Sequence, residues 1–229
     1  MEALHSTPSS AEPKTGLIRE QVHKTLRREI LSCSLRPGEE LREKELATRF
    51  EVSKSPVRDA LQKLEREGLV SVEPRQGYRV TPISLADAKD MFVFRTVMES
   101  GCIKEAVRHA SDTDLKRLDQ FRQFTSTENI ADDFIKYNND FHSAVAACSG
   151  NARMAQTSRT LIDHMGRLIY LSLSVIQGRE PQELVNEHCE IIDAMQDRNG
   201  RLACRLARSH VEEAEKRVIK ALEWNMIIP

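Results

Sequence analysis

The segment from Leu41 to Val80 restricts the fold of this chain most, because a helical and a strand-like hydrophobic period follow each other within it. Its middle, from Pro56 to Gly68, repeats apolar side chains at i, i+3, i+4 and i+7, as one buried face of a helix requires. A shorter helical pattern runs from Glu43 to Phe50, and residues 51–53 make a tight turn between the two. Two short helices joined in this way predict a helix-turn-helix.

The second helix of this pair has a cap and a polar stripe. Ser53 or Ser55 can cap its first turn. Lys54, Arg58 and Gln62 are spaced at i, i+4 and i+8, so that all three project from one side of the helix. Such side chains reach phosphates and base edges in a major groove.

After the second helix the hydrophobic period changes to that of a strand. Val70 and Val72 alternate with polar residues, residues 74–77 contain a Gly and suit a turn, and Tyr78 and Val80 alternate again. Two short strands around such a turn predict a hairpin. A hairpin directly after a recognition helix is a wing.

The run LREKELATRFEVSKSPVRDALQKLEREGLVSVEPRQGYRV resembles the winged helix-turn-helix of the GntR family of bacterial transcription regulators, and the likeness extends over residues 17–82. The resemblance implies binding to double-stranded DNA, with the wing tip in the minor groove. The candidate DNA-binding residues are Lys44, Ser53, Lys54, Ser55, Arg58, Gln76 and Gly77. Lys44 and Lys54 stand where Arg is commoner in the family. Because lysine donates as a point charge, we assign these two to phosphates instead of guanine edges.

A winged helix that contacts another protein is the alternative, and charge does not decide between them. Residues 14–82 contain fifteen Lys or Arg against eleven Asp or Glu, a mild excess concentrated near the second helix and the wing. The whole chain has a formal net charge of -1. This value argues against a broad surface for nucleic acid or membrane, so any DNA contact is local.

The rest of the composition predicts a cytoplasmic protein. The first sixteen residues are polar and rich in Pro and Ser, and they have neither a basic start nor an apolar run. We interpret them as a disordered arm instead of a signal peptide, and no transmembrane segment follows. The five cysteines stand singly, which is typical of reduced thiols.

Helical patterns dominate, so we expect a mainly α fold with a domain boundary near residue 82. A helix over residues 17–34 is expected to open the DNA-binding domain, with Ile18, Val22 and Leu26 facing inward. Six later helices are expected over residues 85–110, 114–125, 130–149, 151–176, 181–197 and 201–224. The predicted domains are an arm at 1–16, a winged helix-turn-helix at 17–82 and an antiparallel six-helix bundle at 83–229.

Three of the bundle helices carry a histidine on a face that should be buried, namely His142, His188 and His210. Asn138 precedes His142 by four residues, so both project from one side of their helix. A lone inward histidine is usually a hydrogen-bonded core residue. Three of them with an amide oxygen can instead bind a first-row divalent metal and leave one or two positions open for water or a carboxylate.

The segments YNNDFHSAVAACSGN, NEHCEIIDAMQDRN and ACRLARSHVEEAEKRV resemble the FCD ligand-binding domain of the FadR-type GntR subfamily. The metal ligands that the resemblance implies are Asn138, His142, His188 and His210. The implied ion is zinc, with nickel or another first-row ion as alternatives, and organic or sugar acids bind against it in the family. Asn138 replaces the commoner Asp and removes one negative charge. Arg95 is assigned to the effector carboxylate, and an intrahelical pair with Glu99 is the alternative.

Together these expectations describe a ligand-responsive repressor. We expect a homodimer on a pseudo-palindromic operator, since one winged helix covers too few base pairs. A small carboxylate that contacts the metal and Arg95 would alter the spacing of the DNA-binding domains. A metal-responsive repressor without an organic effector and a metalloenzyme are the alternatives. An enzyme is disfavoured, because the one candidate acid or base is Glu187, whose helix position turns it away from His188.

Overall fold

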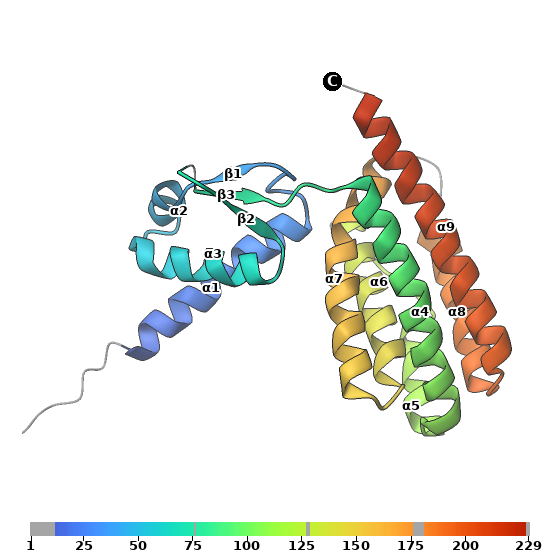
Figure 1. The fold of residues 1–229 in the computed structure, drawn as a ribbon. Helices are drawn as coiled ribbons and strands as arrows, with labels where there is room; N and C mark the ends of the chain where they lie inside the picture. The colour runs from blue at the N-terminus through green and yellow to red at the C-terminus, as the bar shows by residue number, and fades with distance from the viewer. Residues whose placement is uncertain (1–11, 76, 127–128, 176–180, 228–229) are drawn as a thin grey trace, which may run out of the picture. The chain divides into compact units, whose positions relative to one another are not determined.

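The computed structural model describes residues 12–75, 77–126, 129–175 and 181–227, and its contacts divide the chain into two units, Met1–Pro82 and Ile83–Pro229 (Figure 1). The first unit consists of α1 (Glu12–Leu31), β1 (Glu40–Leu41), α2 (Glu43–Arg49), α3 (Lys54–Arg66), β2 (Val70–Glu73) and β3 (Gly77–Val80). The second consists of α4 (Leu85–His109), α5 (Asp112–Lys116), the 3-10 helix η1 (Arg117–Phe121), α6 (Ile130–Ala147), α7 (Ala152–Val175), α8 (Pro181–Gln196) and α9 (Gly200–Ile227). The protein is therefore mainly helical.

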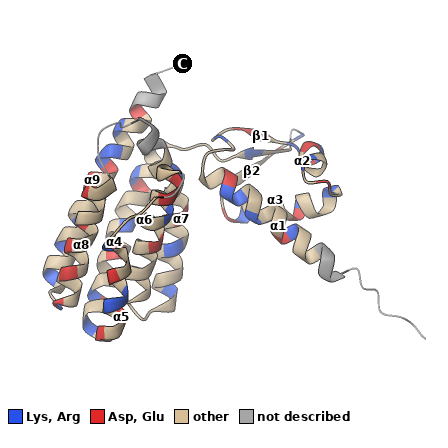
Figure 2. Cartoon of the chain, turned by 180° about the vertical axis from the view of Figure 1, so that it is seen from behind, with Lys and Arg blue, Asp and Glu red and all other residues tan. Residues whose placement is uncertain are grey.

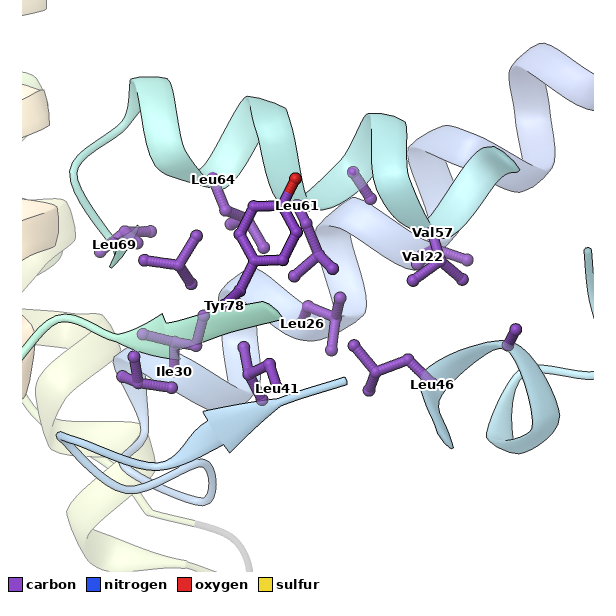
Figure 3. Packing of buried hydrophobic residues seen from close by; sticks show 14 residues of the cluster. Val22, Leu26, Ile30, Leu41, Leu46, Val57, Leu61, Leu64, Leu69 and Tyr78 are labelled. Atoms are coloured by element: carbon purple, nitrogen blue, oxygen red, sulfur yellow. The ribbon is translucent and has the colours of Figure 1, made fainter. Parts of the chain in front are cut away.

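The core of the first unit lies where α1, α3 and a small antiparallel sheet meet (Figure 3). The sheet order is β1-β3-β2, and Val72 faces Tyr78 across the hairpin. Val57, Leu61 and Leu64, which form the predicted apolar stripe of α3, are fully buried. Burying each such side chain contributes about 1.5–3 kcal/mol. The buried stripe fixes the rotation of α3 and leaves its polar side exposed.

Several details of this unit differ from the expectations. Helix α1 begins at Glu12, so residues 12–16 are not part of a disordered arm; Pro13 suits its first turn because a first-turn residue needs no N–H partner. Ile18 is 38% exposed and does not face the core. Ser53 occupies the N-cap position of α3, but its side chain makes no cap hydrogen bond. Strand β1 was not predicted, because two residues are too few to show a period.

The bundle core consists of two hydrophobic clusters separated by a layer of buried polar side chains. On α4, Phe92 belongs to one cluster and Ile103 to the other, and the buried Arg95 and Glu99 lie between them in the sequence. The antiparallel α9 passes through the same layers in reverse order. This polar layer therefore interrupts a core that could have been continuously apolar, and it contains the three predicted histidines.

The helix expected over residues 114–125 is wrong in part. The chain forms the short helix α5 and then continues as the 3-10 helix η1, which ends at Phe121. Phe121 packs into the core, and its backbone carbonyl accepts a hydrogen bond of 2.7 Å from the Tyr137 hydroxyl. This hydrogen bond ties the end of η1 to α6. The other predicted bundle helices are present with ends shifted by a few residues, and Asn129 caps α6 as expected.

None of the described helices is both long enough and apolar enough to cross a membrane.

Candidate functional site

The predicted DNA-binding side chains of α2 and α3 are accessible. Lys44 on α2 and Ser53, Lys54, Ser55 and Arg58 at the start of α3 are all exposed. The polar side of α3 is exposed because the apolar stripe on its opposite side packs into the core. Lys, Arg, Asp and Glu are interspersed over the helices (Figure 2), so the candidate surface is defined by these particular side chains and not by a large field of one sign.

Arg58 is held by an ion pair that the sequence analysis missed. Its Nε and one Nη each donate a hydrogen bond of 2.8 Å to the two carboxylate oxygens of Glu43 on α2. Hydrogen bonding to Arg58 lowers the pKa of Glu43 below its usual value, although partial burial opposes this. The two-pronged pair fixes the guanidinium plane. Glu43 therefore positions the one arginine among the candidate DNA contacts.

At the wing, Gly77 is required by the backbone. It has φ of +109°, and a Cβ there would lie 3.0 Å from the carbonyl oxygen of Leu41 on β1. A larger residue would therefore push β1 and β3 apart. Gln76, the other predicted wing-tip residue, lies outside the described residues.

In the bundle, the structure brings the three predicted histidines together from three helices. His142 on α6, His188 on α8 and His210 on α9 are all buried, and one ring nitrogen of each lies within 4.8 Å of the others. Phe141 stacks on His188 with ring centroids 3.9 Å apart. The burial of the three rings would shield a bound ion from water.

Each histidine has an oxygen partner on Nδ1. His142 Nδ1 lies 2.9 Å from Glu99 Oε1, and His210 Nδ1 lies 2.7 Å from Glu187 Oε2. His188 Nδ1 lies 3.1 Å from the Tyr137 hydroxyl. The oxygens of the two carboxylates are acceptors, so they assign the Nδ1 proton to His142 and His210.

The tautomer of His188 follows from its neighbour. Tyr137 donates its hydroxyl proton to the carbonyl of Phe121, so its oxygen accepts from His188 Nδ1–H. The lone pair of His188 is then on Nε2, a buried atom with no hydrogen-bond partner in the described structure. Metal-binding histidines characteristically donate their other N–H to a carboxylate or similar acceptor. All three histidines therefore have Nδ1 bonded to an oxygen and their lone pair on Nε2, although Nε2 of His142 lies 2.6 Å from Arg95 Nη2.

The surroundings keep these imidazoles neutral. Burial, followed by the charge of Arg95, lowers the pKa of His142 to about 4. Burial also lowers the pKa of His188 and His210 below the usual histidine value. Burial alone would raise the pKa of Glu99, but His142 and Arg95 hold it well below its usual value. The site thus contains neutral ligand nitrogens beside an ionised carboxylate.

The residues present fit a divalent metal once the ligand nitrogens draw together and Arg95, whose Nη2 lies 2.6 Å from His142 Nε2, moves away. In a tetrahedral zinc site with metal–nitrogen distances of about 2.0–2.1 Å, two ligand nitrogens lie about 3.3–3.4 Å apart. Nitrogens separated by up to 4.8 Å must therefore approach each other by as much as about 1.5 Å. Asn138 is buried one turn before His142, and its Nδ2 has no hydrogen-bond partner among the described residues. Its amide can thus turn without losing a bond at that nitrogen.

A small cavity of about 50 Å³ adjoins the histidines. Its polar lining consists of Arg95, Asn138, Ser172, His210 and Arg217, and apolar residues such as Phe134 and Ile169 complete it. Arg95 pairs with Glu99 at 3.1 Å, as the alternative interpretation expected, and it also lines this cavity.

Sequence reasoning missed the acidic partners of the histidines. Glu187 was predicted to turn away from His188, but it contacts His210 on the neighbouring helix. Glu99 was considered only as a partner for Arg95, and it also holds His142. Glu99 follows Arg95 by four residues, beside the apolar face of α4. A carboxylate at such a position is expected to be buried and therefore to need a second polar partner, and this could have pointed to His142.

The comparisons with known proteins find a match for each of the two units. Residues 18–80 match the family of bacterial regulatory proteins named gntR, and residues 90–213 match the FCD domain. The chain is 28% identical over 214 residues to the HTH-type transcriptional repressor RspR of Escherichia coli, covering 92% of this chain and 93% of that protein.

Two solved structures share the fold. A GntR transcriptional regulator from Rhodococcus sp. RHA1 is 23% identical with a TM-score of 0.71, over 88% of this chain and 97% of that one. Escherichia coli McbR/YncC is 21% identical with a TM-score of 0.70, over 91% and 98%. The family and the relatives are transcriptional regulators and not enzymes. The chain therefore belongs to the GntR family of bacterial transcriptional regulators, with a winged helix-turn-helix followed by an FCD domain.

Proposed function

We propose that this regulator is a homodimeric repressor of a pseudo-palindromic operator, and that a divalent metal and a small organic acid in the FCD domain control its binding to DNA. The observation that carries the proposal is the common orientation of the three histidines. Each has an acceptor on Nδ1 and a buried Nε2, which is the arrangement of metal ligands.

At the DNA, the exposed lysines and Arg58 have different roles. Lys44 and Lys54 contact phosphates, and these contacts supply affinity that depends on salt. Arg58 is oriented by Glu43 and reads a base edge, for which a planar guanidinium is suited. Since its target is bacterial DNA, the protein acts in the cytoplasm.

In the bundle, His142, His188 and His210 hold the metal, and Asn138 supplies a neutral oxygen. Zinc is the first candidate because it prefers few nitrogen and oxygen ligands, and nickel is the second. When bound, the ion supplies a Lewis-acidic position for a carboxylate oxygen. A neutral Asn in place of an acid makes the site less negative and so weakens retention of the ion.

The cavity beside the histidines indicates an acidic effector. Arg95 and Arg217 both line it, and guanidinium groups bind carboxylates with paired hydrogen bonds. Its volume of about 50 Å³ is well below that of a typical ligand site of about 300 Å³ or more. Binding therefore requires side chains to move, and this movement is how occupancy is transmitted to the helices around the cavity.

The test at the DNA is protection of a short palindrome upstream of the gene, at several salt concentrations and with a panel of organic and sugar acids. We expect Arg58→Ala to abolish protection. Lys136→Ala, on an exposed part of α6, is the control and should not change it. Loss of protection with one acid identifies the effector class. Absence of sequence-preferring binding under every condition would contradict the proposal.

The test at the metal site is the zinc and nickel content of the purified protein after dialysis against a trace of each ion. We expect one ion per chain in the wild type and a large loss in His188→Ala and His210→Ala. His109→Ala is the matched control, because His109 lies at the exposed end of α4. Equal retention in all three variants would show that the bound ion is elsewhere.

A metal-responsive repressor is the second candidate, and the small volume of the cavity favours it. If the ion is the signal, removing it with a chelator changes operator affinity and no acid in the panel has a further effect. If an acid is the signal, the chelator and the acid both change affinity, and the acid acts only on the metal-loaded protein.

A further inference from the structure

The side chain of Arg95 is part of a closed ring of three buried groups. Its Nη2 lies 2.6 Å from His142 Nε2, and its Nε donates to Glu99 Oε2 at 3.1 Å. The other oxygen of Glu99 accepts from His142 Nδ1 at 2.9 Å. The side chains of Arg95 and Glu99 are 2% and 8% exposed, so water does not replace these bonds.

This ring uses the nitrogen of His142 that a metal needs. His142 donates its Nδ1 proton to Glu99, so its single lone pair is on Nε2 and accepts a hydrogen bond from Arg95. A neutral imidazole has no second lone pair for a metal ion. The guanidinium is also permanently charged, so it cannot relieve the conflict by losing a proton. Arg95 and a metal cation thus exclude each other at His142.

The cavity offers Arg95 another position. Arg95 lines the 50 Å³ cavity together with Asn138, Ser172 and Arg217, so a rotation of its side chain brings the guanidinium into that lining. Within a buried site, the free guanidinium requires a new acceptor, because leaving a buried charge without hydrogen bonds is costly. A carboxylate of a small molecule in the cavity is such an acceptor.

The charges around the histidines also favour an anionic ligand once a metal is bound. Two carboxylates, those of Glu99 and Glu187, hydrogen-bond to these histidines, and together they balance a divalent cation. Arg95 would then add a positive charge at short range. A monoanionic carboxylate that pairs with Arg95 restores the balance, so the metal-loaded site favours an anionic occupant.

We propose that Arg95 couples the two ligands of the FCD domain: it blocks His142 Nε2 until the carboxylate of an organic acid in the cavity takes over its guanidinium. Metal and acid then bind with positive cooperativity, and each raises the affinity of the other by the same factor. The proposal rests on the metal site proposed above and adds the residue that links it to the effector.

The test is a zinc titration of the full-length protein against a chromophoric chelator, in sodium acetate and in sodium chloride of equal ionic strength. Acetate is the probe because it is a small monoanionic carboxylate. We expect acetate to raise the zinc affinity of the wild type by at least about fivefold, the lower end of ordinary coupling between sites. Arg95→Met should bind zinc as tightly in chloride as the wild type does in acetate, and acetate should have no further effect on it.

Lys136→Met is the control, because it removes an equal charge from an exposed part of α6 outside the cavity lining. If Arg95 acts through the lone pair of His142, Lys136→Met leaves zinc affinity in chloride unchanged. An equal gain in both variants would show a general charge effect and overturn the proposal. An unchanged zinc affinity in Arg95→Met, or an acetate effect of the same size as in the wild type, would also overturn it.

Removing Arg95 leaves Glu99 with one partner fewer and could unfold the bundle. The double variant Arg95→Met/Glu99→Gln avoids this, because the amide oxygen of Gln still accepts from His142 Nδ1 and neither charge of the buried pair remains. As in Arg95→Met, acetate should have no effect on its zinc affinity. Cobalt absorption spectra add a second readout, since acetate should change the coordination of cobalt in the wild type far more than in this variant.

Failure of this inference is distinguishable from failure of the proposed site. A wild-type protein that binds neither zinc nor cobalt at the three histidines would contradict both. A wild type that binds zinc through His188 and His210 but is indifferent to Arg95→Met would contradict only the coupling through Arg95.

Discussion

At the scale of single residues, the candidate DNA-binding and metal-binding side chains are oriented by charged neighbours. Arg58 illustrates this at the DNA surface, because the carboxylate of Glu43 fixes the plane of its guanidinium with two bonds of 2.8 Å. A lysine in the same place carries the same charge and has no such plane. The distinction between affinity and specificity can therefore be tested at this position.

We predict that Arg58→Lys keeps most of the affinity for random DNA and loses about 1–3 kcal/mol of discrimination in favour of the operator, the usual value of one bidentate base contact. Titrations of operator and random duplexes at one salt concentration measure both quantities. Arg66→Lys, at the exposed far end of α3, is the control and should change neither. A parallel loss of affinity for both duplexes would instead assign Arg58 to a phosphate.

His23 gives the winged helix a defined dependence on pH. It is buried on α1, and its Nε2 donates to Glu67 Oε1 at 2.8 Å. Burial lowers the pKa of His23 below the usual value of 6.5. The hydrogen bond and charge of Glu67 raise this pKa in part, and the charges of Lys63 and Arg27 lower it further. The unfolded chain therefore binds a proton more readily than the folded one in the interval between the two pKa values.

It follows that the stabilisation by neutral His23 is fully present above pH 6.5 and is lost as the pH falls from there toward the folded pKa. We predict that the stability advantage of the wild type over His23→Gln shrinks when the pH is lowered from 8 to 5.5. Calorimetric unfolding of both full-length proteins measures this difference, and contributions from the bundle histidines cancel in it. A difference that does not change with pH would show that His23 titrates alike in both states.

At the scale of elements, the wing depends on one glycine. Gly77 has φ of +109°, and a Cβ would lie 3.0 Å from the Leu41 carbonyl oxygen. We predict that Gly77→Ala lowers the free energy of unfolding by about 1–3 kcal/mol, the usual cost of such a backbone conformation, and also weakens operator binding. Urea unfolding and DNA titration measure the two effects. Gly16→Ala, which meets no atom within 4 Å in helix α1, should cause no such loss.

The elements also show how far a sequence can predict this structure. The apolar stripe of α3 and the alternation of the hairpin were sufficient to predict these elements. Each is a local hydrophobic period, and its residues, such as Val57, Leu61 and Val80, are buried in the structure. Strand β1 and the 3-10 winding before Phe121 were not predictable, because both depend on pairing with distant segments. The same applies to Glu187, whose contact with His210 depends on how α8 and α9 lie side by side.

At the scale of the whole molecule, a dimer requires a surface, and α4 has the most suitable one among the described helices. Val93, Phe94 and Val97 are 64%, 44% and 65% exposed, and their spacing places them on one side of the bundle's first helix. Clustered large apolar side chains on a surface usually mark an association site. A twofold axis near them would bring the two copies of this helix together, as the two half-sites of an operator require.

We predict that Val97→Asp converts the proposed dimer to a monomer at micromolar concentration and lowers operator affinity much more than affinity for a single half-site. Because Val97 is exposed, the change should leave the unfolding temperature of each chain nearly unaltered. Light scattering after size exclusion gives the mass, and titration of full and half operators gives the two affinities. Ile130→Asp is the matched control, since Ile130 is 61% exposed on α6, away from the α4 cluster in sequence. If Val97→Asp stays dimeric, the interface lies elsewhere; if the wild type is a monomer that still protects both half-sites, the two copies assemble only on the DNA.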